Sequence, residues 1–246
     1  QLMAECAQSV KRTSMELGGN APFIVFDDAD IDAAVQGTLV SKYRNAGQTC
    51  VCSNRIIVQA GIYDEFVSKL TAATKNLVIG SGTEEGVTVG PLIDEKAANN
   101  VCDFIDDAVA KGAKVALGGG RSDLGGSFVL PTILTDVSRD MRVFSEEIFG
   151  PVAPVFKFDT EAEVVEMAND TEFGLAAYFY SRDIGRVWRV AEQLEYGIVG
   201  VNEGVVSNEM APFGGVKESG SGREGSKYGM DDYMVMKYIC MGGIDK

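Results

Sequence analysis

A cysteine and a glutamate in this 246-residue chain have the types and settings that covalent catalysis needs. Cys50 ends the polar, glycine-containing segment 45–50, which leads into an apolar run over residues 55–58. A thiol in a loop at the mouth of a strand is well placed to act as a nucleophile. The chain contains no histidine, so the base has to be a carboxylate or a lysine. Glu16, which lies just before two glycines, is the best candidate.

Both residues also have a plain structural interpretation. A lone cysteine is more often a small buried hydrophobe than a nucleophile, and a single glutamate before glycines usually faces solvent. From the residues alone, the nucleophile and the structural cysteine are evenly matched. Cys52 follows Cys50 by two positions, and in an extended segment the two side chains share one side. Such a pair closes a small, strained ring that is easily reduced, so we expect a reversible Cys50–Cys52 disulfide.

Composition argues against several classes of function. The net charge is −14 and no cluster of lysine and arginine is present, so binding to nucleic acid is not expected. No apolar run reaches membrane-spanning length, so no membrane partner is expected. Five cysteines without a disulfide-framework spacing favour a reducing compartment, and we expect a cytoplasmic protein. Without a histidine to complete a Cys-X-Cys pair, a structural zinc site is not expected.

Short apolar runs alternate with amphipathic stretches along most of the chain. This alternation predicts an α/β fold with a mostly parallel sheet and helices on both faces. The apolar stretch over residues 231–241 predicts a C-terminal strand that needs a covering partner, which we expect to serve oligomerisation. Further strands are expected over residues 23–26, 55–58, 114–117, 152–158, 176–180 and 198–201. Helices are expected over residues 1–10, from 30 to before 47, and over 63–77, 94–111, 161–168 and 183–194.

Several multi-residue motifs carry a resemblance to a known family. Four of them, in this order and at these separations, resemble the aldehyde dehydrogenase superfamily across the whole chain. They are Met-Glu-Leu-Gly-Gly-Asn-Ala-Pro (15–22), Asn-Ala-Gly-Gln-Thr-Cys (45–50), Glu-Glu-Ile-Phe-Gly-Pro-Val (146–152) and Pro-Phe-Gly-Gly-Val-Lys-Glu-Ser-Gly (212–220). Further segments are similar to the succinate-semialdehyde dehydrogenases in particular: residues 42–44, the pair Cys50 and Cys52, and residues 201–208 and 222–229.

The resemblance implies oxidation of succinate semialdehyde to succinate through a cysteine thiohemiacetal and a thioester. Cys50 matches the nucleophile, and Glu16 matches the residue that activates the hydrolytic water. Arg44 and Ser207 match residues that bind the distal carboxylate of the substrate, and Phe213 matches a residue that lines the aldehyde tunnel. Glutarate semialdehyde, one methylene longer, is the alternative substrate, because a pocket discriminates a methylene by only about 1–3 kcal/mol.

The same resemblance implies NAD or NADP as cofactor. Glu147 matches the residue that holds the nicotinamide ribose, Phe149 packs nearby, and Leu17 belongs to the same cofactor-binding set. Without the resemblance, Glu146 and Glu147 are more simply an acidic loop. Neither a P-loop nor a dinucleotide fingerprint is present in the sequence.

The resemblance also bears on domain organisation. Members of the family are roughly twice as long and begin with a cofactor-binding domain, and many assemble as dimers or tetramers. We therefore expect the protein to form a homo-oligomer and this chain by itself to be inactive. Residues 1–17 are expected to be the last helix and strand of the cofactor-binding domain, residues 18–218 the catalytic domain and residues 219–246 the C-terminal segment with the oligomerisation strand. The alternative is a non-catalytic fragment that acts as a folding or oligomerisation module.

Overall fold

The computed structural model describes residues 1–243 of the chain. Seven strands form its central sheet: β2 (Ala21–Val25), β3 (Ser53–Gln59), β4 (Lys114–Leu117), β5 (Thr132–Thr135), β6 (Val152–Phe158), β7 (Ala176–Tyr180) and β8 (Ile198–Val201). Their order across the sheet is β4-β5-β6-β3-β2-β7-β8. Every neighbouring pair is parallel except β4 and β5. The expected α/β fold with a mostly parallel sheet is confirmed.

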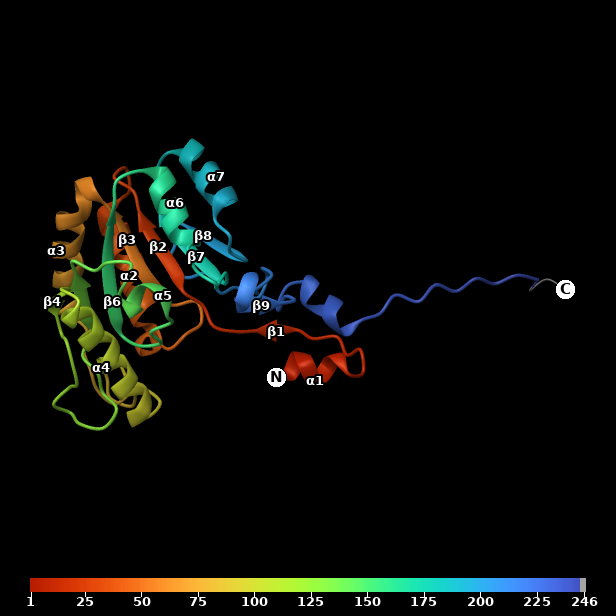
Figure 1. Ribbon diagram of the computed structural model, residues 1–246, viewed down its shortest axis with the longest axis horizontal. Coiled ribbons are helices and arrows are strands. Elements are labelled where there is room, and N and C mark those ends of the chain that lie inside the picture. Colours follow the sequence, from red (N-terminus) through yellow and green to blue (C-terminus); the bar gives the residue numbers. More distant parts are fainter. Residues whose placement is uncertain (244–246) are drawn as a thin grey trace.

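Helices flank this sheet (Figure 1). The α-helices are α1 (Leu2–Ala7), α2 (Ile31–Tyr43), α3 (Tyr63–Thr74), α4 (Glu95–Ala110), α5 (Arg142–Ser145), α6 (Glu161–Asn169) and α7 (Ile184–Gln193). Short 3₁₀ helices are η1 (Arg44–Gly47), η2 (Ala60–Ile62), η3 (Lys217–Ser219) and η4 (Tyr228–Tyr233). Asp30 and Asp94 cap α2 and α4, accepting hydrogen bonds from the Ala33 and Ala97 N–H groups at 3.1 and 2.7 Å. These caps explain why both helices begin where the sequence predicts.

The central strands form the core of the molecule. All five residues of β2 and all five of β7 are buried, as a parallel sheet covered on both faces requires. The Phe23 ring stacks on Tyr178 and Tyr180 of the neighbouring strand at centroid distances of 5.8 and 5.2 Å. This packing holds β2 against β7, while parallel ladder pairing joins the other side of β2 to β3. The residues that precede β2 and β3 form the candidate site.

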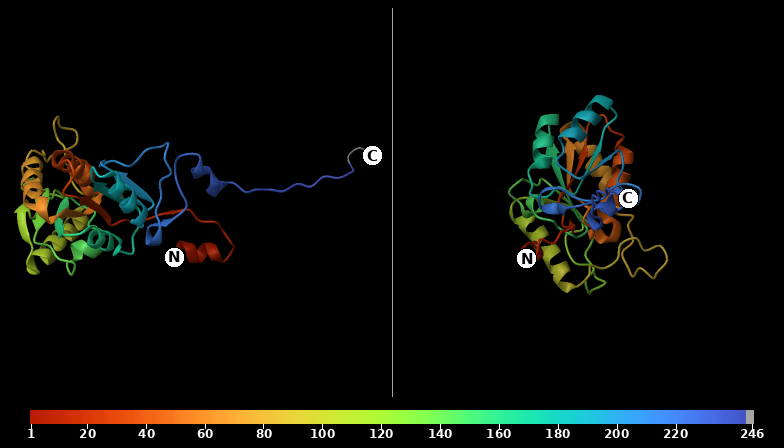
Figure 2. Two further views of the ribbon diagram at one scale, coloured as in Figure 1. Left: turned by 90° about the horizontal axis from the view of Figure 1, so that it is seen from above. Right: turned by 90° about the vertical axis from the view of Figure 1, so that its right-hand side faces the viewer.

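The two ends of the chain leave the sheet domain, residues 18–218, on the same side (Figures 1 and 2). Strands β1 (Met15–Glu16) and β9 (Gly220–Ser221) form an antiparallel pair. A bond of 3.0 Å from the Leu17 N–H to the Ser219 carbonyl extends this pair. We call residues 1–17 and 219–243 the terminal extension; none of the residues of α1 is buried.

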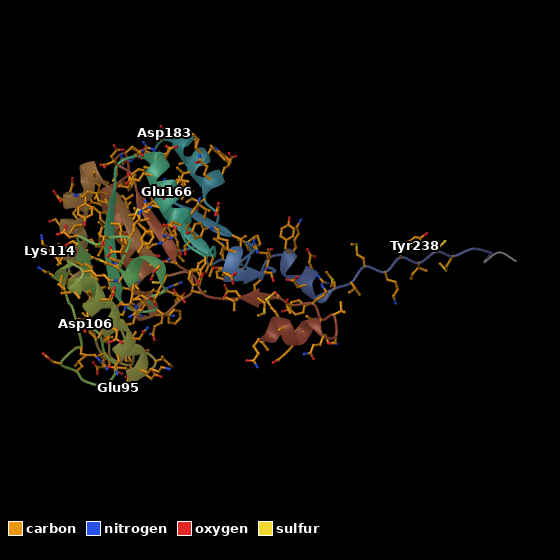
Figure 3. The ribbon with its side chains drawn as sticks, viewed as in Figure 1. Glu95, Asp106, Lys114, Glu166, Asp183 and Tyr238 are labelled. Atoms are coloured by element: carbon orange, nitrogen blue, oxygen red, sulfur yellow. The ribbon has the colours of Figure 1, made fainter. Side chains whose placement is uncertain are left out.

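Residues 231–241 form no strand in the described part of the single chain, and a strand completed by another subunit stays a prediction. Residues Asp231–Tyr233 belong to η4, and from Met234 to Gly243 the chain is extended without a ladder partner. A strand needs hydrogen bonds to a neighbour, and the described part of one chain offers this segment none. Tyr238 stands on the tail well away from the sheet domain (Figure 3) and is 87% exposed.

Candidate active site

The loop between α2 and β3 is shaped by consecutive residues with positive φ. Asn45, Ala46 and Gly47 have φ values of 53°, 55° and 76°. Gly47 has to be a glycine, because a Cβ atom there would collide with the backbone carbonyl of Gly150. The backbone of the loop is therefore fixed against the segment that precedes β6, and the chain beyond it is aimed at the start of β3.

A turn, rather than an extended segment, carries Cys50. The Cys52 N–H donates a hydrogen bond of 3.0 Å to the Thr49 carbonyl oxygen, and this turn removes the side-chain alternation of a strand. The expectation that Cys50 and Cys52 share one side of an extended segment is therefore wrong. Cys50 is half-buried, whereas the buried Cys52 has its Sγ 3.5 Å from the carbonyl oxygens of Lys42 and Ser53. Both thiols are free, and the reversible disulfide stays a prediction.

The register of β2 and β3 brings the glutamate segment to the cysteine turn. The two strands are parallel neighbours in which Ala21 pairs with Ser53, so the residues before both strands meet at one edge of the sheet. Gly19 packs so tightly there that a Cβ atom on it would lie 2.5 Å from the Cys50 carbonyl oxygen. The parallel pairing of β2 and β3 therefore brings together residues that are more than thirty positions apart in the sequence.

Glu16 and Cys50 face each other across this edge. Burial first, and then the negative charge of Glu16, raise the pKa of the Cys50 thiol to about 11. Burial also raises the pKa of Glu16, although the nearby Cys50 thiol acts in the opposite direction. The arrangement is a protonated thiol beside a carboxylate whose affinity for protons is increased, so a proton can pass between them.

Glu147 lies beside this pair. Its Oε1 accepts a hydrogen bond of 3.0 Å from the Gly19 N–H, and a Cβ atom on Gly18 would come within 2.7 Å of its Oε2. Burial raises the pKa of Glu147, while the Gly19 N–H and the Lys42 ammonium act against that shift. The neighbouring Phe149 has a φ of 51° and is 44% exposed. Glu16, Cys50 and Glu147 are therefore brought together, as the sequence predicts.

Lys42 is a residue of this site that sequence reasoning missed. It is fully buried on α2, and its Nζ has no hydrogen-bond partner among residues 1–243. Its positive charge favours the charged forms of Cys52 and Glu147, lowering the pKa of both groups against the effect of burial. A lysine in an amphipathic helix is normally read as a surface residue, and only its proximity to the cysteine motif could have singled it out.

The residues expected to bind the substrate lie on more exposed segments. Arg44 opens η1 and is exposed. Burial raises the pKa of Cys52, and the Arg44 charge acts weakly against that rise. Ser207 is exposed in the segment after β8, and no hydrogen bond or ion pair joins it to Arg44 within residues 1–243. Phe213 is half-buried, and a reciprocal pair of backbone hydrogen bonds of 2.9 and 2.7 Å ties it to Glu224. The carboxylate clamp of Arg44 and Ser207 stays a prediction.

An open groove lies beside the site, and Gln48 stands between the two loops that line most of it. The Gln48 side chain donates to the Asn45 carbonyl at 2.9 Å and accepts from the Ile93 N–H at 2.8 Å. Through these bonds it joins the loop over residues 90–93 to the loop that leads to Cys50. The groove is lined by Asn45, Gln48, Gly90, Pro91, Leu92, Ile93 and Phe149. The loop at residues 90–93 was not among the expected site residues, and its sequence carries no chemical signal.

Leu17, expected at the cofactor, is 44% exposed between β1 and the two glycines. Over residues 1–243, no group of three or more cysteines, aspartates and glutamates is arranged to hold a metal ion. In the same range, none of the helices combines the length and apolar character needed to cross a bilayer.

Comparison with known proteins extends across nearly the whole chain. Over 244 residues it is 66% identical to a glutarate-semialdehyde dehydrogenase of Pseudomonas aeruginosa, covering 99% of the chain and 50% of that protein. It is 62% identical to the succinate-semialdehyde dehydrogenase [NADP(+)] of Escherichia coli, over 98% of the chain and 50% of that protein. It is 63% identical to a 3-sulfolactaldehyde dehydrogenase of Pseudomonas putida, over 100% of the chain and 50% of that protein. The chain thus spans about half the length of these curated relatives.

Solved structures agree with the sequence comparison. The fold matches the crystal structure of succinate-semialdehyde dehydrogenase from Burkholderia pseudomallei with a TM-score of 0.97 and 63% identity. That match covers 98% of this chain and 50% of the solved one. The sequence pattern of the aldehyde dehydrogenase family matches residues 1–239. This chain belongs to the aldehyde dehydrogenase family.

Proposed function

We propose that the full-length protein to which this chain belongs oxidises succinate semialdehyde to succinate with NAD or NADP. The observation that carries this proposal is the Glu16 carboxylate facing the Cys50 thiol at one edge of the sheet. A buried thiol beside a carboxylate can form and release an acyl group without a histidine. Residues 18–218 serve as the catalytic domain in this proposal, and residues 1–17 are the end of a cofactor-binding domain.

The first step is attack of Cys50 on the aldehyde carbon. Because the pKa of the thiol is about 11, its proton has to leave as the carbon–sulfur bond forms. Glu16 is the neighbouring group that accepts it, and the carbonyl electron pair moves to the oxygen. The Cys50 backbone N–H lies beside its own sulfur and can donate to that oxyanion.

A nicotinamide cofactor supplies the acceptor for the hydride that leaves this thiohemiacetal. Glu147 fits the ribose end of such a group, because its Oε1 is held by the Gly19 N–H and its Oε2 makes no hydrogen bond within residues 1–243. The Phe149 ring is 44% exposed next to it. The chain's own sequence offers no glycine-rich phosphate cradle, so the rest of the cofactor has to bind elsewhere in the longer protein.

Hydrolysis of the thioester regenerates the enzyme. The proton that Glu16 accepted from the thiol is first released to solvent, which restores the carboxylate. Glu16 then takes a proton from water as the water oxygen attacks the acyl carbon, and the carbon–sulfur bond breaks. Burial raises the pKa of Glu16, which makes this carboxylate a better base than one in open solvent. The proton returns to the departing Cys50 sulfur.

The names of the relatives support a substrate with an anionic group far from the aldehyde. Two semialdehydes end in a carboxylate and sulfolactaldehyde in a sulfonate. Arg44, exposed six residues ahead of Cys50, can bind such a group through its planar fork. Ser207 contributes a hydroxyl to this clamp, and Phe213 lines the path to the thiol. Glutarate semialdehyde is the second candidate, since one relative bears that name.

Exchanging Arg44 tests the substrate assignment. In the full-length protein, Arg44→Ala should raise KM for succinate semialdehyde by about 10- to 100-fold, the loss expected for a charge-assisted hydrogen bond. Turnover of an uncharged aldehyde such as butanal should change little. Arg182→Ala, an exposed arginine after β7 at the opposite edge of the sheet, is the matched control. Equal losses on both aldehydes would remove Arg44 from the clamp.

The chain alone is proposed to fold but not to act as a dehydrogenase, because it holds only the ribose end of the cofactor. Calorimetric titration of the 246-residue chain with NAD+ and NADP+ should show no saturable binding, and no NAD(P)H should form with succinate semialdehyde. Saturable binding with turnover would contradict this. We also propose a homo-oligomer in the cytoplasm, whose contacts include the apolar tail.

A further inference from the structure

The side chain of Asn54 holds the backbone on both sides of Glu147. Its Nδ2 donates to the Glu146 carbonyl oxygen at 2.9 Å, and its Oδ1 accepts from the Ile148 N–H at 3.1 Å. Asn54 is the second residue of β3 and is only 3% exposed. Glu147 therefore lies between two backbone groups that are both bound to one side chain.

Asn20 fixes the orientation of that side chain. The Asn54 Nδ2 also donates to the Asn20 Oδ1 at 2.7 Å, and the Asn20 Nδ2 donates to the Phe144 carbonyl at 2.9 Å. The backbone carbonyl of Asn20 accepts a bond of 3.0 Å from the buried Arg55 guanidinium. A buried network whose members are all paired is rigid, because each broken bond leaves a desolvated polar group.

The same network reaches the nucleophile. Gly19, next to Asn20 in sequence, donates its N–H to the Glu147 carboxylate and packs against the Cys50 carbonyl. Asn54 follows Cys50 by four residues on the strand that the cysteine turn enters. The backbone around Glu147 is thus bound by Asn54 of β3, and the Glu147 carboxylate is bound by Gly19, which lies in the same segment as Glu16.

We propose that Asn54 is a positioning residue that sets the place of the Glu147 carboxylate relative to Cys50, and so controls how the nicotinamide ribose engages the site. The inference rests on the proposed function, in which Glu147 binds that ribose. The bland alternative is that Asn54 only stabilises the loop before β6.

The chain offers a matched control for that alternative. Asn169 makes the same pair of side-chain-to-backbone hydrogen bonds to a different loop. Its Nδ2 donates to the Gln193 carbonyl at 2.8 Å, and its Oδ1 accepts from the Glu195 N–H at 3.0 Å. That loop, between α7 and β8, carries none of the proposed site residues. A purely structural contribution should lower the free energy of unfolding in both variants, more for Asn54 because it is buried whereas Asn169 is half-buried, and should not raise the cofactor KM selectively.

The test compares four variants of the full-length protein: Asn54→Ala, Asn54→Ser, Asn169→Ala and Glu147→Gln. We expect Asn54→Ala to raise KM for NAD(P)+ by about tenfold, the effect of one or two lost hydrogen bonds. KM for the aldehyde and the rate of Cys50 alkylation should change less than about twofold by the same reasoning. Asn54→Ser keeps a buried hydroxyl but cannot span both backbone groups. If Asn54→Ala fails to fold, Asn54→Ser should still show a raised cofactor KM with a nearly unchanged aldehyde KM and alkylation rate.

Each outcome decides the proposal. A rise in cofactor KM for the Asn54 variants and Glu147→Gln, with Asn169→Ala like the parent, supports it. The same change in Asn169→Ala, or no change in either Asn54 variant while Glu147→Gln loses cofactor binding, overturns it. If Glu147→Gln itself leaves cofactor KM unchanged, the proposed role of Glu147 fails and the positioning role of Asn54 falls with it.

Discussion

The sheet domain and the terminal extension are held in different ways. In β2 every residue is buried, and the strand is bonded on both sides by parallel neighbours. In the terminal extension, β1 and β9 contribute two residues each to their ladder, and α1 has no buried residue. The first region carries its own core, whereas the second leaves most of its apolar side chains in solvent.

The proposed catalytic pair spans the boundary between these regions. Cys50 is placed by β3 and a loop of fixed backbone geometry, but Glu16 belongs to the short β1 ladder. A short two-stranded ribbon is marginal by itself. The position of Cys50 therefore depends on the core, whereas the position of Glu16 depends on what packs against the β1–β9 pair. The predictions below test this contrast.

The largest difference should appear in stability. Phe23→Ala removes a fully buried ring from β2 and should lower the free energy of unfolding by about 3–5 kcal/mol. Met236→Ala removes a side chain that is fully exposed on the tail and should change it by less than about 0.5 kcal/mol. Urea unfolding monitored by circular dichroism measures both, and a Met236 variant as destabilised as the Phe23 variant would show that the tail packs on the core.

Removal of the tail should change association rather than folding. Deleting residues 235–246 keeps the contacts of Arg12 with the carbonyls of Asp231 and Met234 and removes a row of exposed apolar residues. These include Val235, Met236, Tyr238, Ile239 and Met241. An unpaired apolar segment of this kind is a ready partner for another sheet edge. We expect a smaller sedimentation coefficient with an unchanged unfolding midpoint, and an unaltered sedimentation profile would count against an assembly role.

The sheet domain could be predicted from the sequence more completely than the site. The bounds of β6, β7 and β8 agree with the expected strands because their apolar runs end at clear polar or turn residues. The short strand β5 was not expected, since its run of Thr132–Thr135 is half polar. The tail shows the opposite case, because its sequence has the apolar pattern of a strand but residues 1–243 contain no ladder partner for it.

Within the site, the motifs predicted which residues meet but not what holds them. The sequence pointed to Cys50, Glu16 and Glu147. Neither Asn54 nor Lys42 was predicted to be buried in the site, because a polar residue at the start of a strand or on a helix normally faces solvent. Burial of Asn54 is a tertiary result, because its partners Asn20, Glu146 and Ile148 lie far from it in sequence. A polar pair such as Asn54 and Arg55 directly before a continuous apolar run is the one signal that could have indicated it.

The ribbon should also control the reactivity of the thiol. The Glu16 charge raises the pKa of Cys50, so Glu16→Gln should lower that pKa and increase the thiolate fraction at every pH below the midpoint. The alkylation rate of Cys50 by iodoacetamide should then rise several-fold at pH 8, since each pKa unit is worth about a factor of ten. In the parent chain the rate should climb with pH toward a midpoint near 11.

Glu218→Gln is the control for this experiment. Glu218 is an exposed carboxylate at the end of the sheet domain, and it is not among the groups that shift the pKa of Cys50. It should leave the alkylation profile unchanged. If Glu16→Gln reacts at the parent rate, the ribbon does not hold Glu16 against the thiol in solution, and the base is positioned only by further parts of the longer protein.

The smallest expected effect concerns oxidation within the core-anchored turn. Cys52 is buried with its sulfur against the carbonyls of Lys42 and Ser53, so a bond to Cys50 requires the turn to open and should form slowly. Peroxide should block alkylation of Cys50 in part, dithiothreitol should restore it, and Cys52→Ala should abolish the restoration. Cys102→Ala, a half-buried cysteine of α4, is the matched control. If the Cys52→Ala protein loses and regains its thiol like the parent, Cys50 is protected by a different partner, and the turn is too firmly held by the core to act as a redox switch.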